Sequence, residues 1–337
     1  MSDSTGMIGV GIVGYGFMGA THARAYEAAR LDGLPCRVVA VCDTLVECLD
    51  GAAQGNLDTG SVAGPTDVEL VRDLDMLLAR DDVDLVSVCT PTDTHVAVAV
   101  RALEAGKHVL VEKPVALTVE PIERLAEAAR IAARLCMPAM CMRFWPAWAW
   151  ALDAARGGRY GKVRSAAFQR LGSRPEWSDF YADAARCGGA LFDLHVHDAD
   201  FALAMLGMPE LVHTMGNHDR MTTAYAFPGG VRATAEGSWA QSPDDPFVMR
   251  FIIEFERASA TFELGREPEL EVMADGVRIA PELAPGVGYD HEVRALVRAI
   301  TKGAGEPPVP LADAAAVTRV LLAERESMET WRPIAIG

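Results

Sequence analysis

Lysine is scarce in this chain of 337 residues, and the scarcity makes each lysine informative. The 31 basic residues comprise 27 Arg and only four Lys, at positions 107, 113, 162 and 302. Arg stays charged at any working pH, whereas Lys can shift its pKa and pass a proton. Lys113 follows an apolar run, 108–111, and directly precedes Pro114. Lys113 is therefore either a chemically active cation at a strand end or a surface cation beside a turn.

The chain also lacks an excess of positive charge, long apolar runs and paired cysteines. A net charge of −16 and a pI near 4.9 disfavour nucleic acids and anionic membranes as partners. No apolar stretch reaches the ~18 residues of a membrane span, and residues 1–6 lack the pattern of a signal peptide. The seven cysteines show no CxxC motif and no zinc-like spacing, which favours reduced thiols. We therefore expect a cytoplasmic protein with no membrane partner.

The length predicts two domains, because one hydrophobic core seldom serves so long a chain. Up to residue 144 short apolar runs alternate with helical stretches. Strands are predicted at 8–14, 37–42, 83–90, 108–111 and 137–144, and helices at 17–31, 67–80, 93–105 and 118–135. This alternation predicts βαβ units, an α/β fold and a doubly wound parallel sheet, that is, a Rossmann domain over residues 1–144. Residues 51–66, rich in Gly and Ala, are expected to be irregular.

Residues 145–337 follow a different pattern, in which strand-like segments accumulate. Strands are predicted at 162–170, 210–216, 231–240, 248–256 and 259–264, and helices at 190–206, 289–302 and 311–328. This order predicts an α+β domain with a large, mostly antiparallel open sheet and helices on one face. We expect this domain to bind the substrate and to carry the contacts of a homodimer or homotetramer.

A glycine-rich loop follows the first predicted strand and opens the first predicted helix. Gly14, Gly16 and Gly19 form a GxGxxG pattern, in which the glycines allow a tight turn, close approach to a pyrophosphate and close helix packing. The helix amino end supplies N–H groups for the phosphates. A Gly-rich turn in another α/β fold is the alternative. The context of strand, loop and helix favours a dinucleotide site.

Asp43 ends the second predicted strand, 24 residues after Gly19. A carboxylate at this place is expected to meet the ribose hydroxyls of the adenosine. It would repel a 2′-phosphate, and neither of the next two residues, Thr44 and Leu45, is an Arg that could bind one. The sequence therefore predicts NAD rather than NADP as the cofactor.

The segment 187–207 is the second informative stretch. If it is an α-helix, Asp193, His197 and Asp200 share one face, and a carboxylate one turn from an imidazole can orient a general base. His195 would point elsewhere, about 200° from His197. A metal site made by the histidines and Asp198 is disfavoured by that divergence, although a strand here would restore it. A structural histidine is the other alternative, and we predict no metal.

Five motifs together resemble one family: the glycine loop, the Asp after the second strand, "CTPTDTH" (89–95), "EAGKHVLVEKP" (104–114) and "GGALFDLHVHDAD" (188–200). They are similar to the glucose–fructose oxidoreductase / myo-inositol dehydrogenase (Gfo/Idh/MocA) family. The resemblance covers the whole chain and is strongest over 8–144 and 187–207. Glu-Lys-Pro is its most specific mark, and in the family this lysine stands beside the nicotinamide and the substrate hydroxyl.

The resemblance also implies the roles of individual residues. The family pattern of Gly-Gly, Asp and then His four residues on matches Gly188, Gly189, Asp193 and His197, so the implied catalytic group is Lys113, Asp193 and His197. The implied cofactor-binding residues are Gly14, Gly16, Phe17, Met18, Gly19, Asp43, Thr90, Pro91, His95, Glu112 and Lys113, with Pro114 shaping the turn. Many members have Gly at the position of His195, which leaves open which imidazole takes the proton; helical geometry favours His197.

The substrate-binding residues are less well defined by the motifs. The segment "RFWPAWAW" (143–150) carries three of the six Trp. Aromatic faces suit sugars, but packing at a domain junction explains such a cluster equally well. The candidates for substrate contacts are Arg143, Trp145, Trp177 and Tyr289, with Tyr181 and Trp239 as weaker ones.

The resemblance implies an NAD-dependent oxidoreductase that transfers a hydride between nicotinamide and a secondary alcohol or ketone of a sugar, polyol or sugar derivative. His197, oriented by Asp193, would take the hydroxyl proton, and Lys113 would stabilise the alkoxide or relay the proton. One alternative is a lyase or glycosidase that oxidises its substrate transiently and recycles NAD. The other is a non-catalytic regulator that binds NAD, although a regulator has no need of the three catalytic candidates.

Overall fold

The computed structural model of the chain describes residues 6–44, 67–176 and 178–337. By their contacts the residues form two compact units. The first comprises Met1–Cys141 and Gly286–Ala315, and the second comprises Met142–Pro285 and Ala316–Gly337. The segment 51–66, expected to be irregular, and the candidate substrate residue Trp177 lie outside the described residues.

The first unit is built on a six-stranded parallel sheet in the order β3-β2-β1-β4-β5-β6. Its strands are β1 (Ile8–Val13), β2 (Cys36–Cys42), β3 (Glu69–Val71), β4 (Leu85–Val88), β5 (His108–Val111) and β6 (Cys136–Pro138). Every residue of β1 and β4 is buried, as is typical of strands that helices cover on both faces. The predicted Rossmann sheet is thus confirmed. Its strand order reverses at β1 and β4, and ligands of such sheets bind at that point, beyond the carboxyl ends of the strands.

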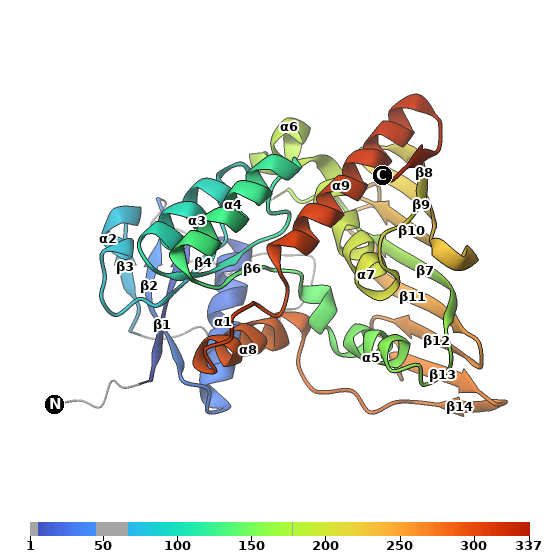
Figure 1. Ribbon diagram of the computed structural model, residues 1–337, viewed down its shortest axis with the longest axis horizontal. Helices are drawn as coiled ribbons and strands as arrows, with labels where there is room; N and C mark the ends of the chain where they lie inside the picture. The colour runs from blue at the N-terminus through green and yellow to red at the C-terminus, as the bar shows by residue number, and fades with distance from the viewer. Residues whose placement is uncertain (1–5, 45–66, 177) are drawn as a thin grey trace. The chain divides into compact units, whose positions relative to one another are not determined.

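Helices lie on both faces of this sheet (Figure 1). α3 (His95–Glu104) and α4 (Val119–Ala132) pack together on one face, and α1 (Phe17–Leu31) and α8 (Gly288–Thr301) on the other. The short helix α2 (Leu74–Leu78) begins after Asp73, whose side chain accepts the N–H of Asp75 at 2.7 Å. The helix predicted over 67–80 is therefore wrong in its first half, where β3 pairs with β2 at the edge of the sheet.

Helix α8 belongs to the first unit although it follows the strands of the second in sequence. It packs on α1 and buries Val293, Leu296 and Val297, and Arg294 donates to Asp32 at 2.5 Å. The boundary expected after residue 144 therefore differs from the structure in two ways. The first unit ends at Cys141, and it also contains Gly286–Ala315. The cause is a tertiary contact between helices more than 250 residues apart in sequence, which local patterns do not encode.

The second unit is built on a nine-stranded sheet in the order β14-β13-β12-β11-β7-β10-β9-β8-β15. Its strands are β7 (Val163–Leu171), β8 (Leu211–Asn217), β9 (Arg220–Ala226), β10 (Arg232–Ser238), β11 (Val248–Phe255), β12 (Ala258–Glu263), β13 (Leu270–Ala274), β14 (Val277–Ile279) and β15 (Ile334–Ala335). β7 pairs in parallel with β10, and the other described pairs are antiparallel. The predicted large, mostly antiparallel sheet is confirmed.

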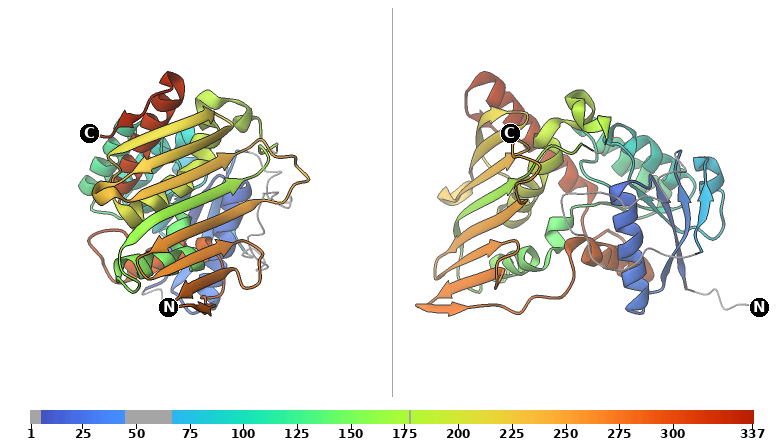
Figure 2. Two further views of the ribbon diagram at one scale, coloured as in Figure 1. Left: turned by 90° about the vertical axis from the view of Figure 1, so that its right-hand side faces the viewer. Right: turned by 180° about the vertical axis from the view of Figure 1, so that it is seen from behind.

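One face of this sheet packs against helices (Figure 2). These are α5 (Pro146–Arg156), α7 (Val196–Leu206) and the part of α9 (Leu311–Thr330) that begins at Ala316. Trp148 of α5 is fully buried, with its ring 4.7 Å from Phe201 of α7 and 5.2 and 5.7 Å from Phe251 and Phe168 of the sheet. At this position the tryptophan-rich segment serves packing.

Several short elements of the second unit escaped prediction. The sequence did not predict β9, β13, β14, β15 and α5. In the first sheet, the strand expected over 137–144 is shorter, because β6 is followed by a 3-10 turn, Cys141–Phe144. β9, "RMTTAYA", alternates buried and exposed residues, with Met221, Thr223 and Tyr225 buried, but it contains no Val, Ile or Leu. Among the described helices, none has the length and apolar character that crossing a bilayer requires.

Candidate active site

The glycine loop of the first unit connects β1 to α1 and fits a bound pyrophosphate. Gly14 has φ +85°, and a Cβ on it would come within 2.7 Å of the carbonyl oxygen of Cys89. A Cβ on Gly19 would be 2.1 Å from the carbonyl oxygen of Gly14. At Gly16, by contrast, an added Cβ would meet nothing within 4 Å. Gly14 and Gly19 are thus packed closely against backbone atoms, whereas the space beside Gly16 is open. The phosphates of a dinucleotide are expected to approach at Gly16.

Other features of this loop also suit an anionic ligand. α1 begins at Phe17, and its N-cap residue is Gly16, which has no side chain to bond to the first N–H groups of the helix. Phe17 and Met18, both predicted to contact the cofactor, are half-buried in the first turn. Asp43 follows β2, and its Oδ2 accepts the N–H of Tyr15 at 2.6 Å, so the carboxylate lies beside the glycine loop. The structure therefore brings together the glycines and the acid that the sequence singled out.

The loop after β4 is held by hydrogen bonds of its own side chains. Thr94 Oγ1 donates to Thr90 Oγ1 or to the carbonyl oxygen of Pro91, each at 2.7 Å. His95 is buried, with Nε2 2.7 Å from the carbonyl oxygen of Thr90 and Nδ1 3.0 Å from that of Pro114. Burial lowers the pKa of His95, against the two carbonyls, which favour the protonated ring. His95 thus lies between the loops that follow β4 and β5, and a neutral ring donates its one N–H to one of the two carbonyl oxygens.

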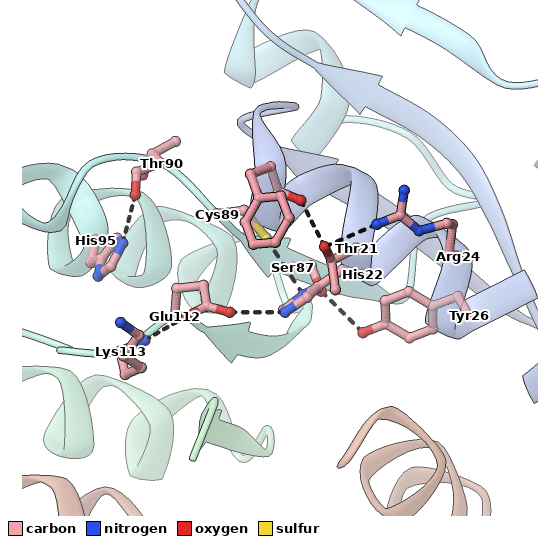
Figure 3. Close-up of polar contacts among 11 residues, drawn as sticks. Thr21, His22, Arg24, Tyr26, Ser87, Cys89, Thr90, His95, Glu112 and Lys113 are labelled. Atoms are coloured by element: carbon pink, nitrogen blue, oxygen red, sulfur yellow. Dashed lines mark hydrogen bonds and ion pairs between the residues drawn. The ribbon is translucent and has the colours of Figure 1, made fainter. Parts of the chain in front are cut away.

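Glu112 and Lys113 follow β5 directly. Glu112 is buried, and its Oε2 accepts the N–H of Lys113 at 3.0 Å. Burial would raise the pKa of Glu112, but the hydrogen bond from His22 and the positive charges nearby outweigh it, so the pKa is lowered. Lys113 is half-buried and lies next to Glu112 in Figure 3. The strand end that carries the Glu-Lys-Pro motif is therefore a charged site inside the first unit.

His22 is a member of this site that the motifs did not indicate. It lies on α1 and is fully buried, with Nε2 3.0 Å from Glu112 Oε1 and Nδ1 3.2 Å from Ser87 Oγ (Figure 3). A histidine three residues after the last glycine of the loop was the available signal. Its partner lies 90 residues away in sequence, which no local pattern reveals.

In the second unit the Gly-Gly motif precedes an unusual helix. Gly188 has φ +78°, and residues Leu191–His195 form a π-helical turn before α7 begins at Val196. The assumption of a uniform α-helix over 190–206 was therefore wrong at its start. π turns are rare and are frequently found at functional sites.

Asp193 and His197 differ from the residues around them in exposure. Between Gly189 and Leu203 these two are the residues that are not buried. A carboxylate and an imidazole four positions apart thus reach the surface of an otherwise buried helical segment. This exposure is what an acid–base pair needs in order to meet a substrate.

His195 lies in a different environment. It is fully buried, with Nε2 3.0 Å from the Tyr225 hydroxyl and 2.8 Å from Glu324 Oε2. Burial opposes the charged ring, but Glu324, with a smaller contribution from Asp198, raises the pKa of His195. These contacts describe a buried ion pair that joins the π turn to β9 and α9.

Two further carboxylates of α7 are also engaged in ion pairs. Asp198, fully buried, accepts from Arg170 of β7 at 2.8 Å. Asp200, predicted to share a face with His197, is buried and accepts two hydrogen bonds from Arg143, at 2.6 and 2.9 Å. Within the described residues no group of three or more His, Cys, Asp and Glu side chains is arranged to hold a metal ion.

The residues predicted to contact the substrate are placed as follows. Arg143 has its guanidinium on Asp200, Trp145 of the second unit is buried, and Tyr289 lies on α8 of the first unit, also buried. Trp239 is buried with its ring 6.0 Å from that of Tyr181. The substrate-side assignments remain predictions.

Two family models match the chain. One, described as an oxidoreductase family with an NAD-binding Rossmann fold, matches residues 8–140, and the other, the GFO/IDH/MocA C-terminal domain, matches residues 148–261.

Relatives extend this likeness. The chain is 36% identical to the uncharacterized oxidoreductase ORF334 of Rhizobium meliloti over 170 residues, which are 48% of this chain and half of that protein. It is 25% identical to the inositol 2-dehydrogenase of Rhizobium meliloti strain 1021 over 317 residues, 88% of this chain and 90% of that protein. It is 31% identical to a glycosyl hydrolase family 109 protein of Shewanella sp. strain W3-18-1 over 161 residues, 47% of this chain but only 33% of that protein. Among solved structures, an oxidoreductase domain protein from Kribbella flavida superposes with a TM-score of 0.84 and 28% identity over 99% of this chain and all of that one.

Proposed function

Because the chain belongs to the Gfo/Idh/MocA family of oxidoreductases, we propose that it is an NAD-dependent dehydrogenase of a sugar, polyol or sugar derivative. The reaction interconverts a secondary alcohol and a ketone. The observation that carries the proposal is the exposure of Asp193 and His197 alone on an otherwise buried helical segment. The relative named as an inositol 2-dehydrogenase, matched along nearly its whole length, supports a polyol-like substrate.

The glycine loop and Asp43 would hold the cofactor in the first unit. The open space at Gly16 would receive the pyrophosphate, and the Asp43 carboxylate would accept hydrogen bonds from the ribose hydroxyls. When bound, NAD supplies the hydride acceptor for oxidation of the alcohol, and NADH the donor for the reverse reaction.

The remaining chemistry falls to three side chains. In the oxidation His197 takes the hydroxyl proton while the hydride leaves the carbinol carbon, and Asp193 orients the imidazole and stabilises its charged form. Lys113 stabilises the developing alkoxide or relays the proton. After the ketone leaves, His197 releases the proton to solvent and is ready for the next turnover.

The test of this function is to follow NADH absorbance while the protein is offered polyols, aldoses and sugar acids. We expect substrate-dependent NADH formation with at least one class, and its loss in His197→Ala. Activity that survives in His197→Ala would contradict the assigned base. If no compound of the panel is oxidised and no matching ketone is reduced, the proposal of a dehydrogenase is wrong and NAD-binding regulation becomes the better hypothesis.

Cofactor preference tests the role of Asp43 separately. A carboxylate facing a 2′-phosphate should disfavour NADPH relative to NADH by about 1–3 kcal/mol, or roughly tenfold to a hundredfold in Kd. Titration of both reduced cofactors by fluorescence measures this ratio. Asp43→Asn is the matched variant, because it keeps an oxygen that can accept the Tyr15 N–H but removes the charge. In this variant we expect the Kd of NADPH to approach that of NADH. Tighter binding of NADPH by the natural chain would overturn the assignment.

A redox-neutral lyase or glycosidase is the second candidate. It is favoured by the similarity to a glycosyl hydrolase family 109 protein, although that match covers a third of the relative. In such a reaction the alcohol is oxidised transiently, the adjacent C–H becomes acidic, elimination follows, and the hydride returns to the product. Turnover of a glycoside with no net NADH accumulation would establish this candidate, whereas one NADH per product would exclude it.

A further inference from the structure

We propose that His22, on the helix that follows the glycine loop, is a positioning residue that holds Glu112 and, through Glu112, the backbone of Lys113. The inference rests on the proposed function in one respect, since it matters for turnover only if Lys113 acts on the substrate. The geometry itself is independent of that role. His22, Glu112 and Ser87 are buried together inside the first unit.

A continuous chain of hydrogen bonds runs through this site (Figure 3). Tyr26 Oη is 3.0 Å from Ser87 Oγ, which is 3.2 Å from His22 Nδ1. The other ring nitrogen, His22 Nε2, is 3.0 Å from Glu112 Oε1. Cys89 Sγ is also near the ring, 3.4 Å from His22 Nδ1. The chain thus connects α1, which carries the glycine loop at its start, to the carboxyl ends of β4 and β5.

The proton positions follow from what each group can do. An ionised carboxylate only accepts, so the proton between His22 and Glu112 resides on Nε2. Nδ1 of a neutral imidazole is then an acceptor, and both groups beside it, the Ser87 hydroxyl and the Cys89 thiol, are donors. The Tyr26 hydroxyl in turn can donate to Ser87. Nδ1 has one lone pair, so the Ser87 hydroxyl at 3.2 Å and the Cys89 thiol at 3.4 Å share it. In a neutral ring this arrangement favours the tautomer with the proton on Nε2, and the contacts on both ring nitrogens orient the ring.

Glu112, held by His22, in turn holds the backbone of the next residue, Lys113. With Oε1 held by His22, the carboxylate presents Oε2 to the N–H of Lys113 at 3.0 Å. The N–H of Glu112 itself is bonded to the carbonyl oxygen of Val88 at 3.0 Å. On the far side His95 bonds the carbonyl oxygen of Pro114. The backbone on both sides of Lys113 is thereby fixed by two histidines, one from α1 and one from α3.

Without the His22 donor, this arrangement is unstable. Glu112 would remain as a buried carboxylate with the Lys113 N–H and the Lys113 side chain to compensate it, beside the Cys89 thiol, on which Glu292 of α8 also acts. Burial favours the protonated acid, so the pKa of Glu112 should rise when the donor is removed. A protonated or rotated Glu112 no longer accepts the Lys113 N–H in the same geometry. The backbone of Lys113 is then no longer held in position.

The scarcity of lysine offers a direct experiment on the protein without cofactor. Labelling with [15N]lysine gives four backbone amide signals, from Lys107, Lys113, Lys162 and Lys302, and Lys113→Arg identifies one of them by its disappearance. In the natural chain the Lys113 amide resonance is recorded from pH 8 to pH 5 and serves as the reference. In His22→Phe the Lys113 resonance should be shifted, and it should titrate at a higher pH than in the natural chain, because Glu112 takes up a proton more readily. The signals of the other three lysines should stay in place. An unchanged Lys113 resonance in the variant would overturn the proposal.

Two further variants control for folding. His22→Gln retains an N–H donor for Glu112 and should restore much of the natural titration, even if His22→Phe proves too unstable to study. Thr21→Ala changes the neighbouring buried residue of α1, whose hydroxyl bonds to the carbonyl of Phe17 and not to Glu112. It should leave the Lys113 resonance unchanged. A shift of equal size in Thr21→Ala would mean that the site responds to any disturbance of α1, which would also contradict a specific role of His22.

Kinetics separate this inference from the proposed function. His22→Phe should lower kcat roughly tenfold to a hundredfold, less than removal of an acid–base group itself, and change the Kd of NADH by less than about threefold. In a Lys113→Ala background His22→Phe should have no further effect on kcat, because it acts through Lys113. An equal loss in both backgrounds would overturn the positioning role. If Lys113→Ala instead keeps normal turnover, the proposed function of the lysine fails while the amide titration still decides whether His22 positions it.

Discussion

A lysine and an arginine carry the same charge but differ in shape and in whether they release a proton. At Lys113 the difference matters, because the residue follows a parallel strand at the edge where ligands of such sheets bind. Its backbone is held by Glu112, and its neighbour Pro114 by His95. This much structural support for one lysine, in a chain that otherwise uses arginine, favours a chemical role over a merely electrostatic one.

Lys113→Arg should therefore lower kcat by roughly 10²–10⁴ while the Kd of NADH changes little. The guanidinium keeps the charge but is larger and does not deprotonate. Lys107→Arg is the matched control in the same unit, since Lys107 Nζ donates to the carbonyl oxygen of Arg80 at 2.8 Å and has no proposed part in catalysis. Both constants are measured on each variant. Near-normal kcat in Lys113→Arg would mean that Lys113 is a structural or cofactor-binding cation.

Substitution of His197 should mainly lower kcat, whereas substitution of His195 should mainly lower the stability of the fold. His197→Ala should lower kcat by roughly 10²–10⁴ with little change in unfolding free energy, because the side chain is half-exposed. His195→Ala should cost about 1–3 kcal/mol of stability, since the buried Glu324 carboxylate loses the imidazole and keeps only the hydroxyls of Tyr225 and Thr223, but should affect kcat less. Thermal unfolding and steady-state kinetics distinguish the two. Activity should also survive chelators, and loss of activity restored by zinc would contradict both assignments.

Whether a single site residue can be predicted from the sequence depends on how far its contacts lie from it along the chain. The glycines, Asp43 and Lys113 could be found because each is tied to a strand end or loop that local patterns reveal. His22 occupies the buried stripe of α1 with Gly19, Ala23 and Tyr26. A histidine in such a stripe is expected to be a core residue, and only the fold brings Glu112 against it.

At the scale of elements, the π turn Leu191–His195 separates two tasks along one helical segment. It directs His195 into a buried contact with β9 and α9, whereas Asp193 and His197 remain half-exposed. Sequence reasoning predicted the helix and the different surroundings of the two histidines, but not the π turn. The periodicity of apolar residues is too coarse to show one widened turn, and the contact of this turn with β10 joins residues that are distant in sequence.

The ion pair that fixes the π turn should make stability depend on pH. The folded pKa of His195 is raised above its ordinary value near 6.5, so its contribution is fully present below about pH 6.5 and is lost as the pH rises through the folded pKa. Glu324 and Asp198 favour the charged ring, Arg170 opposes it, and Tyr225 and Thr223 are hydrogen-bonded to Glu324. Glu324→Gln should therefore cost more at pH 6 than at pH 9, roughly 1–3 kcal/mol at the lower pH.

Chemical denaturation at several pH values measures this dependence. Glu326→Gln, the same substitution at an exposed position of α9, is the control and should change the unfolding free energy by less than about 0.5 kcal/mol. A cost of Glu324→Gln that is equal at both pH values would show that the carboxylate supports the turn without the charge on His195.

At the scale of the whole molecule, the chain leaves its first unit after Cys141 and returns to it at Gly286. The pattern of strands and helices predicted both sheets but assigned α8 to the second, because a helix that follows strands in sequence is expected to cover them. Its apolar face in fact completes the first unit against α1. Fold class is readable from periodicity, whereas the membership of a returning helix is decided by which surface it buries.

The first unit should consequently depend on the segment Gly286–Ala315 for its stability. Val293, Leu296 and Val297 are each fully buried, and burial of one such side chain contributes about 1.5–3 kcal/mol as an upper estimate. A fragment of residues 1–141 joined by a flexible Gly/Ser linker to 286–315 should unfold cooperatively and bind NADH. The fragment 1–141 alone should be less stable by several kcal/mol, and Leu296→Ala in the joined fragment should lose about 2–5 kcal/mol. Circular dichroism during thermal unfolding and NADH fluorescence make the comparison. If 1–141 alone proves as stable and binds NADH as tightly, α8 is an accessory to the first unit and the boundary after residue 144 would suffice to describe it.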